Sequence, residues 1–319
     1  MDEFEIIKKY FVSLTKNNKN SLNLNDDVFF DKKRKIVMSM DTYVEGVHFY
    51  NFLKPSLVIK KIIRSSISDL ICKGVKPKFY FISGSGNKKN FAKKNLLKIL
   101  KSLKDEQKKY NISLSGGDTT FSSKLSFTIT SLGYADVIVY RNKSRLNDDI
   151  YVTGNLGDSF IGLQILKSKI KVNSIMSKFF IKKYFKPDLQ LKFINNFSKI
   201  ANTSIDVSDG LIDDLKKMTN RQNFSFHIFE EKIPISKTLS QLIKIKKFKK
   251  LNVTSRGDDY QILFTASPIK SRIIEKISKN TGVKVTKIGK IISGKNRSKI
   301  ISIKNKQIVP KNKGYIHQF

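Results

Sequence analysis

Hydrophobic and polar positions along the chain follow two rhythms, one with the period of a helix and one with the period of a strand. Apolar residues recur at helical spacing over 56–74, and Gly74 closes that segment. Over 125–135, apolar and polar residues alternate with the period of two that a half-buried strand requires. A short apolar run over 36–40 predicts a further strand that ends at Asp41. The pattern therefore predicts helices and strands mixed along one chain.

The two rhythms continue to the C-terminus without internal repeats. Further helices are predicted over 90–110 and 157–168, strands over 78–84, 112–116, 149–154, 258–267 and 283–291, and a strand running into a helix over 204–218. Asp158 or Ser159 stands where a helix N-cap is expected. Polar and basic residues over 136–147 separate two groups of elements. We therefore predict an α/β protein with mixed sheets of the α+β type, divided into domains 1–140 and 141–319.

The net charge of +36 is large, but it does not by itself indicate a nucleic-acid-binding protein. Only 8 of the 62 basic residues are Arg, whose planar guanidinium is the usual reader of base edges. The basic residues are also spread along the chain, so we interpret most of this charge as solvated surface. A basic nucleic-acid-binding protein remains an alternative.

The location of the protein follows from simpler features. No apolar run reaches the length that spans a bilayer, and the acidic, amphipathic N-terminus does not resemble a signal peptide. The single cysteine, Cys72, excludes an internal disulfide and falls on the apolar side of a predicted helix. We expect a cytoplasmic protein without a membrane segment.

Carboxylates are scarce in this chain, and their positions indicate where a metal ion could bind. Only 26 acidic residues occur, and many stand at predicted strand or helix ends: Asp26, Asp27, Asp41, Asp69, Asp118, Asp206, Asp209, Asp258 and Asp259. Strand ends of α/β folds converge on ligand crevices. Converging carboxylates repel one another unless a cation holds them, and Mg²⁺ prefers oxygen ligands. For Asp158, Asp213 and Asp214 we favour the simpler interpretation of turns or helix caps.

Two glycines precede one of these aspartates. Gly116 and Gly117 would let backbone N–H groups approach a phosphate closely, beside Asp118. No Walker A or kinase glycine-rich motif occurs, so a nucleotide here would be bound in another way. Taken alone, the Gly-Gly-Asp triplet is equally compatible with a tight turn.

Taken together, the motifs resemble a known family. The segments 25–28, 39–49, 68–77, 115–120, 152–159, 204–211 and 257–264 follow the order found in thiamine-monophosphate kinases, members of the aminoimidazole ribonucleotide synthetase superfamily. SMDTYVEGVHF and SIDVSDGL are the specific signatures, and the resemblance extends from about residue 3 to the C-terminus. It implies the two-domain architecture of that superfamily, a homodimer, and a cleft that binds ATP and several Mg²⁺ without a P-loop.

The resemblance also implies roles for individual positions. The implied metal ligands are Asp27, Ser39, Met40, Asp41, Asp69, Asp118, Asp206 and Asp209. Met40 replaces the usual Thr, so only its backbone carbonyl could serve. The implied ATP contacts are Tyr110, Gly117, Arg141 and Ser208, and the implied thiamine phosphate contacts are His48, Asp258 and Tyr315. Asp209 and Arg141 are the implied catalytic residues.

A few positions depart from the family pattern. Asn25 and Asn147 replace glycines, which is a mild change because Asn tolerates left-handed backbone. Arg256 replaces a Gly, and Asp258 replaces a Glu in the usual Gly-Gly-Glu-Asp-Tyr motif. The shorter carboxylate at Asp258 affects the expected substrate contact more than the fold.

The implied reaction is direct, in-line transfer of the γ-phosphoryl group of ATP to thiamine monophosphate, the last step of thiamine diphosphate biosynthesis. A phosphate monoester is already anionic at neutral pH, so the acceptor needs no general base, and positioning with charge neutralisation suffices. Another ATP-using member of the superfamily, acting on a different substrate, is the nearest alternative. It would keep the metal cluster but change EGVHF and the C-terminal motif.

Overall fold

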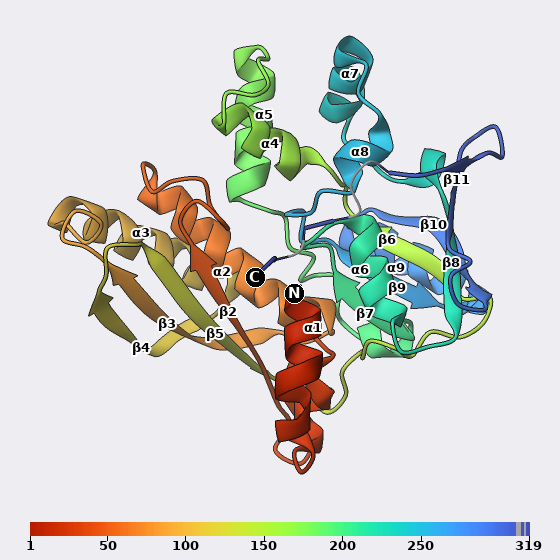
Figure 1. The fold of residues 1–319 in the computed structure, drawn as a ribbon, viewed down its shortest axis with the longest axis horizontal. Helices are drawn as coiled ribbons and strands as arrows, with labels where there is room; N and C mark the ends of the chain where they lie inside the picture. The colour runs from red at the N-terminus through yellow and green to blue at the C-terminus, as the bar shows by residue number, and fades with distance from the viewer. Residues whose placement is uncertain (311–313, 316) are drawn as a thin grey trace.

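The computed structural model describes residues 1–310, 314–315 and 317–319, and within them the strands form two sheets. The five-stranded sheet has the order β1-β2-β5-β3-β4, and the seven-stranded sheet has the order β12-β11-β8-β10-β6-β9-β7. Figure 1 shows the first sheet on the left and the second on the right, with α2 running between them.

The strands of each sheet come from separate stretches of chain. The first sheet contains β1 (Phe29–Asp31), β2 (Ile36–Val44), β3 (Pro77–Gly86), β4 (Ser113–Phe121) and β5 (Ser126–Tyr134). The second contains β6 (Asp149–Thr153), β7 (Thr203–Asp206), β8 (Phe224–Phe229), β9 (Ile262–Ala266), β10 (Val285–Ser293), β11 (Lys299–Ile301) and β12 (Gln307–Ile308). Both sheets are mixed, because β3 pairs with β4 and β8 with β11 in parallel, whereas the other pairs are antiparallel. The mixed α/β fold class is confirmed, and the domain boundary at residue 140 stays a prediction.

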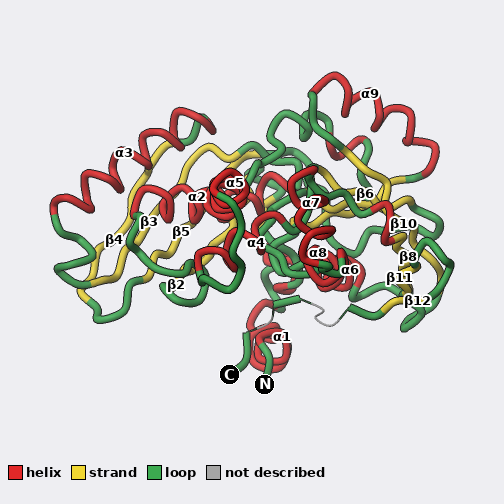
Figure 2. The backbone as a smooth tube through the Cα atoms, turned by 90° about the horizontal axis from the view of Figure 1, so that it is seen from above, coloured by secondary structure: helices red, strands yellow, loops and turns green. Residues whose placement is uncertain are grey.

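The helices cover the sheets and fill the space between them. They are α1 (Glu3–Ile6), α2 (Pro55–Cys72), α3 (Lys93–Tyr110), α4 (Asp158–Leu166), α5 (Ser174–Phe185), α6 (Leu211–Thr219), α7 (Lys237–Lys246), α8 (Lys250–Thr254) and α9 (Ser271–Thr281). Short π or 3₁₀ segments lie at Ile7–Phe11, Val12–Thr15, Lys19–Leu24, Phe197–Lys199, Glu230–Lys232 and Pro268–Lys270, and the segment Lys19–Leu24 is kinked at Leu22 and Asn23. Seen from above, α3 lies over the first sheet and α9 over the second (Figure 2).

Helix α2 is the element that both halves share. Pro55 occupies its first turn, and Gly74 follows its end with a φ of +82°, a left-handed conformation that glycine adopts without strain. The helix packs against β2 and β5 of the first sheet and β7 and β9 of the second. Polar side chains such as Lys61 and Arg64 are buried along it as well as apolar ones, because both sheets cover it.

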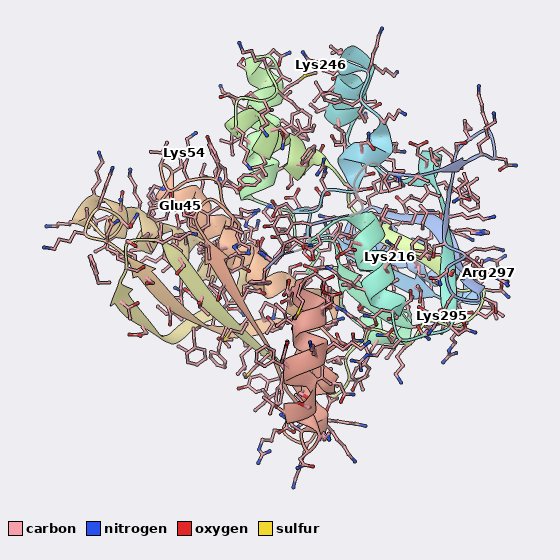
Figure 3. All side chains as sticks on the ribbon, in the orientation of Figure 1. Glu45, Lys54, Lys216, Lys246, Lys295 and Arg297 are labelled. Atoms are coloured by element: carbon pink, nitrogen blue, oxygen red, sulfur yellow. The ribbon has the colours of Figure 1, made fainter. Side chains whose placement is uncertain are left out.

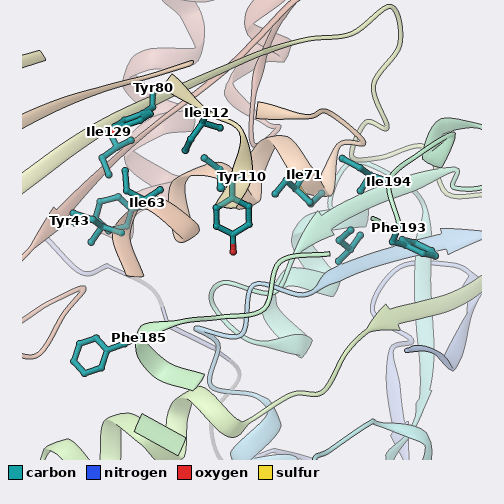
Figure 4. Close-up of a cluster of buried hydrophobic side chains, with 14 of the residues drawn as sticks. Tyr43, Ile63, Ile71, Tyr80, Tyr110, Ile112, Ile129, Phe185, Phe193 and Ile194 are labelled. Carbon is teal, nitrogen blue, oxygen red and sulfur yellow. The ribbon is translucent and has the colours of Figure 1, made fainter. Parts of the chain in front are cut away.

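One hydrophobic core extends through both halves. Tyr43 and Ile63 from the first half belong to the same buried cluster as Phe193 and Phe264 from the second. Figure 4 shows part of this cluster, with side chains from α2, the first sheet and the segment after α5. The two sheets are therefore joined by apolar packing as well as by chain connection.

In the part of the chain that the structure describes, α2 covers one face of the first sheet at β2 and β5, and the opposite face is open. Side chains alternate along a strand, so β2 buries Val37, Ser39 and Tyr43 against α2 while Met40 points the other way and is 70% exposed. On the same open face Phe81 is 39% exposed, and the ring of Tyr134 lies 6.4 Å from that of Phe79. This face, with Met40, Phe79, Phe81 and Tyr134, is called the open sheet face below.

Two strands continue beyond the predicted ends. The strand predicted to end at Asp41 runs on to Val44, and the strand predicted over 112–116 runs on to Phe121. Gly117 and Asp118 therefore lie inside β4, and the interpretation of the triplet as a tight turn was wrong. Pairing with β3, from Phe79–Ser113 to Gly86–Phe121, keeps the segment extended.

The cap of α4 also differs from the prediction. The N-cap residue is Gly157, not Asp158 or Ser159, and it has a φ of +89°. Its N–H donates to the carboxylate of Asp259 at 2.7 Å, so a residue about a hundred positions away supplies the cap. Asp158 instead accepts a hydrogen bond from the Ser236 hydroxyl at 2.7 Å.

The two termini lie side by side, as Figures 1 and 2 show. The Met1 ammonium donates to the Phe319 carbonyl at 3.0 Å, and the Glu3 N–H donates to the His317 carbonyl at 3.3 Å. Asp2 and Gln318 form an isolated antiparallel bridge. This pairing holds the last residues against α1, beside the cleft described below.

The basic side chains are spread over the surface. Figure 3 labels Lys54 before α2, Lys216 on α6, Lys246 on α7 and Lys295 after β10, which lie on different parts of the molecule. Among the residues that the structure describes, no helix is long and apolar enough to cross a membrane.

Candidate active site

A cavity of about 770 Å³ opens between the two halves. It is lined by residues from β2, α2, the loop after β7, the segment 256–260, α4 and the C-terminal residues: Asp41, Tyr43, His48, Ser65, Asp69, Phe160, Asp206, Ser208, Asp209, Arg256, Asp258, Tyr260, Tyr315 and His317 are among them. Most of the residues predicted for metal or substrate therefore meet in one cleft, although the chain separates them by up to 275 positions, from Met40 to Tyr315.

Three predicted metal ligands converge at this cleft, where Asp69 and Asp206 line the cavity and Asp27 adjoins them. Asp27 precedes β1, Asp69 lies on α2 and Asp206 ends β7, and their carboxylate oxygens lie within 4.8 Å of one another. Burial, followed by the nearby Asp41 charge, raises the pKa of Asp69 well above its usual value. Burial also raises the pKa of Asp206 to about 6. Crowded, buried carboxylates of this kind are stabilised by a divalent cation, so the donor set fits Mg²⁺.

Asp41 stands beside this group. Burial is the main cause that raises the pKa of Asp41 to about 6, and the Tyr43 hydroxyl donates to its carboxylate at 3.1 Å. The Asp209 charge raises the same pKa further, which places the two carboxylates within electrostatic reach. Asp41 thus connects the first cluster to the loop after β7.

Asp27 is already bound by two cations of the chain. The Lys73 ammonium lies 2.6 Å from one Asp27 oxygen and 2.7 Å from Asp26. The Arg141 guanidinium pairs with the other Asp27 oxygen, and its backbone N–H donates to Asp26 at 2.9 Å. The sequence indicated Arg141 as an ATP contact, but it did not indicate Lys73, whose role depends on burial.

A second acidic cluster follows β7. Asp209, Asp213 and Asp214 bring carboxylate oxygens within 4.8 Å of one another, around the ammonium of Lys217. One Asp214 oxygen accepts the N–H groups of Asp209 at 3.1 Å and Gly210 at 2.9 Å, so Asp214 caps the start of α6 as its simpler interpretation implies. Asp209 alone of these three was predicted to bind metal.

Aromatic and imidazole rings form the opposite wall. His48 lies 5.3 Å from the ring of His317, which in turn lies 5.0 Å from Tyr315. The His48 Nδ1 accepts the Val44 N–H at 3.0 Å. Burial, with a contribution from His317, lowers the pKa of His48 to about 4, so its imidazole is neutral at pH 7. The family resemblance indicated His48 and Tyr315 as substrate contacts but not His317. The only feature that could have pointed to His317 is its position in the C-terminal motif.

Asp258 is held at the edge of the cleft by two side chains. The Lys61 ammonium contacts its carboxylate at 2.5 Å and the Tyr260 hydroxyl donates to it at 3.0 Å. Lys61 is only 1% exposed and lies 4.3 Å from the ring centre of Tyr184. The sequence shows Lys61 only as a lysine within an apolar helix, and a lysine in such a helix can equally lie on its solvated side.

Other predicted residues flank the cleft. The Ser39 side chain is buried, and its hydroxyl donates to the Ser66 carbonyl at 3.3 Å. Met40 lines the cleft but turns its side chain toward the open sheet face. Ser208 lines the cleft, and its carbonyl accepts the Asp258 N–H at 2.8 Å. Arg256 also lines it, against the ring of Phe160.

The structure places three predicted residues away from this cleft. Of the described residues that line it, none comes from β4, which carries Gly117 and Asp118. Strand β4 is three positions from β2 in the sheet, which corresponds to about 14 Å at the usual strand spacing. Tyr110 is buried in the hydrophobic core (Figure 4), with its ring 5.6 Å from the Arg64 guanidinium.

The two-sheet fold and its cleft agree with a broader class of proteins, those related to AIR synthase. Residues 25–135 match the family model of the AIR synthase related protein, N-terminal domain. The HypE–HypF complex, at 15% identity and a TM-score of 0.76 over 96% of this chain and 99% of that chain, shares the fold alone.

Closer relatives narrow the class to one family. Thiamine-monophosphate kinase of Buchnera aphidicola subsp. Schizaphis graminum is 33% identical over 329 residues, covering 99% of this chain and 98% of that protein. That of Haemophilus influenzae is 32% identical over 91% of this chain and 89% of that protein. The structure of AaThiL complexed with AMPPCP and TMP has a TM-score of 0.85 at 25% identity, over 99% of this chain and 97% of that chain. The chain belongs to the thiamine-monophosphate kinase family.

Proposed function

We propose that this chain transfers the γ-phosphoryl group of ATP directly to the phosphate of thiamine monophosphate, giving thiamine diphosphate and ADP. The observation that carries the proposal is a single cleft in which crowded, buried carboxylates share the lining with aromatic and imidazole rings. The family relatives named above support the same reaction over the full length of the chain.

The carboxylate side of the cleft would bind the metal–nucleotide complex. Bound Mg²⁺ would neutralise the phosphates, which is the main requirement of phosphoryl transfer. Asp27, Asp69 and Asp206 would hold it, with Asp41 and Asp209 beside them. Arg141 is 13% exposed and would add a positive charge toward the transferred group.

The ring side would bind the thiamine moiety. A cationic thiazolium ring is attracted to aromatic faces, which Tyr315 supplies. A neutral His48 adds no like charge against that cation, and the carboxylate of Asp258 offers an opposite one. Lys61 and Tyr260 would keep that shorter carboxylate in position, which offsets the loss of the usual Glu.

We also propose that the enzyme is a homodimer joined through the open sheet face. The face exposes Met40, Phe79, Phe81 and Tyr134 together, whereas exposed apolar residues of a monomer are usually scattered. Pairing of two such faces would also cover β4. Asp118 and Gly117 could then serve the nucleotide site of the partner, which their distance from β2 in one chain does not allow.

The test is incubation of the protein with ATP, Mg²⁺ and thiamine monophosphate, followed by chromatography for thiamine diphosphate and ADP. Equal amounts of the two products support the proposal. Turnover of ATP only with a different acceptor would instead identify a sibling enzyme. Salt-sensitive binding to DNA without ATP turnover would favour the nucleic-acid alternative. A phospho-enzyme trapped with labelled ATP alone would exclude direct transfer.

A further inference from the structure

Lys73 is a lysine with no exposed surface, at the C-terminal end of α2. Its ammonium lies 2.7 Å from Asp26, 2.6 Å from Asp27 and 2.8 Å from the Ser204 carbonyl. These three acceptors match the three N–H donors of an ammonium group. The group is therefore fully satisfied inside the protein, at the junction between the loop before β1 and strand β7 of the second sheet.

The two cations on Asp27 differ in their freedom to leave. Arg141 is partly exposed and contacts Asp27 by a long side chain, so it can turn toward a ligand in the cleft. Lys73 has no exposed surface, and if it moved it would leave Asp26 without its cation and take a donor away from the Ser204 carbonyl. Only Arg141 can exchange with a ligand at Asp27.

We propose that Lys73 is a resident cation of the metal-binding cluster. It holds Asp26 and Asp27 in place before any metal ion arrives, and it remains bound to them when Mg²⁺ and nucleotide enter. One position beside the Asp27 carboxylate, which a metal ion could otherwise occupy, is thus permanently occupied by the Lys73 ammonium. Lys73 acts through Asp27 and is a positioning residue. The inference rests on the proposed function only in naming Mg²⁺ as the ion that the cluster binds.

The test is the thermal unfolding of Lys73→Met, measured in EDTA, in millimolar Mg²⁺, and in NaCl of equal ionic strength. In EDTA we expect the midpoint to fall by roughly 10 °C, because two buried carboxylates lose their shared cation. In Mg²⁺ we expect most of that loss to be recovered, since the metal ion takes the place of the ammonium. NaCl should not restore it, and the unchanged protein should gain much less from Mg²⁺.

Arg64→Met is the matched control. Arg64 lies on the same helix, is 5% exposed, and forms a buried pair with Glu106 at 2.8 Å outside the aspartate cluster. Its removal should lower the midpoint by a similar amount, equally in EDTA and in Mg²⁺. An equal response of Lys73→Met in the two buffers would assign Lys73 a purely structural role and overturn the proposal.

A second variant keeps the test decisive if Lys73→Met does not fold in EDTA. Lys73→Gln retains hydrogen-bond donors without the charge, and its binding of Mn²⁺, counted by electron paramagnetic resonance, should exceed that of the unchanged protein by one ion per chain. An unchanged count would contradict the proposal. Neither measurement requires ATP or thiamine monophosphate, so both remain interpretable if the kinase assay fails.

Discussion

Two clusters of carboxylates lie at the cleft, and each is paired with a buried lysine. Lys73 binds Asp26 and Asp27, and Lys217 contacts Asp209, Asp213 and Asp214. Removal of a buried charge from its partner leaves an uncompensated ion, which is costly. At the scale of the residue, the site is therefore a set of coupled charges in which the carboxylates outnumber the cations of the chain, and its members are not interchangeable.

Asp209→Asn should abolish turnover with the fold intact. The change removes one negative charge that faces the cleft, and the loss of an electrostatic contact to the transition state lowers kcat on the order of 10²–10³-fold. Steady-state kinetics with thiamine monophosphate measure it, and circular dichroism checks the fold.

Asp213→Asn is the matched control for that experiment. Asp213 contacts the same Lys217 ammonium at 3.0 Å but was not predicted to bind metal. We expect its kcat to stay within about tenfold of the unchanged enzyme, which corresponds to less than 1.4 kcal/mol. Full activity of Asp209→Asn would remove Asp209 from the catalytic residues.

His48 should make the fold sensitive to acid. Its pKa is lowered from 6.5 to about 4 in the folded protein, chiefly by burial, so between these values the unfolded chain binds the proton and the folded chain does not. Stability should therefore fall as the pH drops from about 6.5 toward 4. Protonation at Nδ1 would also break the hydrogen bond from the Val44 N–H.

Thermal unfolding against pH measures this effect, with His48→Gln as the comparison. We expect the unchanged protein to lose more stability than His48→Gln over that pH range, and the two to run parallel above pH 7. Parallel curves over the whole range would show that His48 titrates alike in the folded and unfolded states.

At the scale of the element, α2 connects the chemistry of both halves. It carries Lys61 toward Asp258, presents Asp69 to the metal cluster, and ends at Lys73. Asp69 and Lys73 are four positions apart and lie on one face of the helix, whereas Lys61 is turned by roughly 80° from Asp69 about the helix axis. Both directions point into the protein because strands of both sheets contact the helix.

Strand β4 needs glycine at one position for a reason that is independent of phosphate. A Cβ on Gly117 would lie 1.9 Å from the Ile82 carbonyl of β3, far inside contact distance. Gly117→Ala should therefore lower the free energy of unfolding by more than about 2 kcal/mol, as clashes with backbone do. Denaturant unfolding without nucleotide measures it.

Gly116→Ala is the control, because its φ of +155° is close to the +159° of Gly117. There the added Cβ would meet only the ring of Phe81, at 3.0 Å, and a side chain can move. We expect a clearly smaller loss of stability. Equal losses would mean that backbone conformation, and not the contact with Ile82, requires glycine at both positions.

At the scale of the whole molecule, the open sheet face should determine the oligomeric state. We expect the protein to have twice its chain mass of 36.6 kDa by light scattering. Phe81→Lys should convert it to a monomer, because a charge at the centre of an apolar interface is left desolvated and unpaired. Activity should fall when dimerisation is lost, if Asp118 serves the nucleotide site of the partner.

Ile269→Lys is the control for this experiment. Ile269 is 87% exposed but lies in the turn before α9, away from the open sheet face. It should leave the mass and activity unchanged. A monomeric unchanged protein with full activity would refute both the dimer and the role of Asp118 in the partner.

Much of the architecture was accessible from periodicity. The helices over 55–72 and 93–110 and the strand β10 agree closely with their predictions, because their apolar spacing is long and regular. The ends of β2 and β4 were missed, since pairing with neighbouring strands extended polar and glycine-containing segments that have little strand propensity of their own. Helix α5 and strand β8 were not predicted at all.

The sequence by itself determined the local elements and the motifs that identify the family, because periodicity and short signatures depend on neighbouring residues. Through the family resemblance it also pointed to Asp27, Asp69 and Asp206, as members of a larger set of metal ligands that included Asp118. Only the tertiary structure decided which cations meet these carboxylates, that His317 joins His48, and that Asp118 stands apart. Burial and charge pairing arise between residues far apart in the chain, so no local pattern could record them.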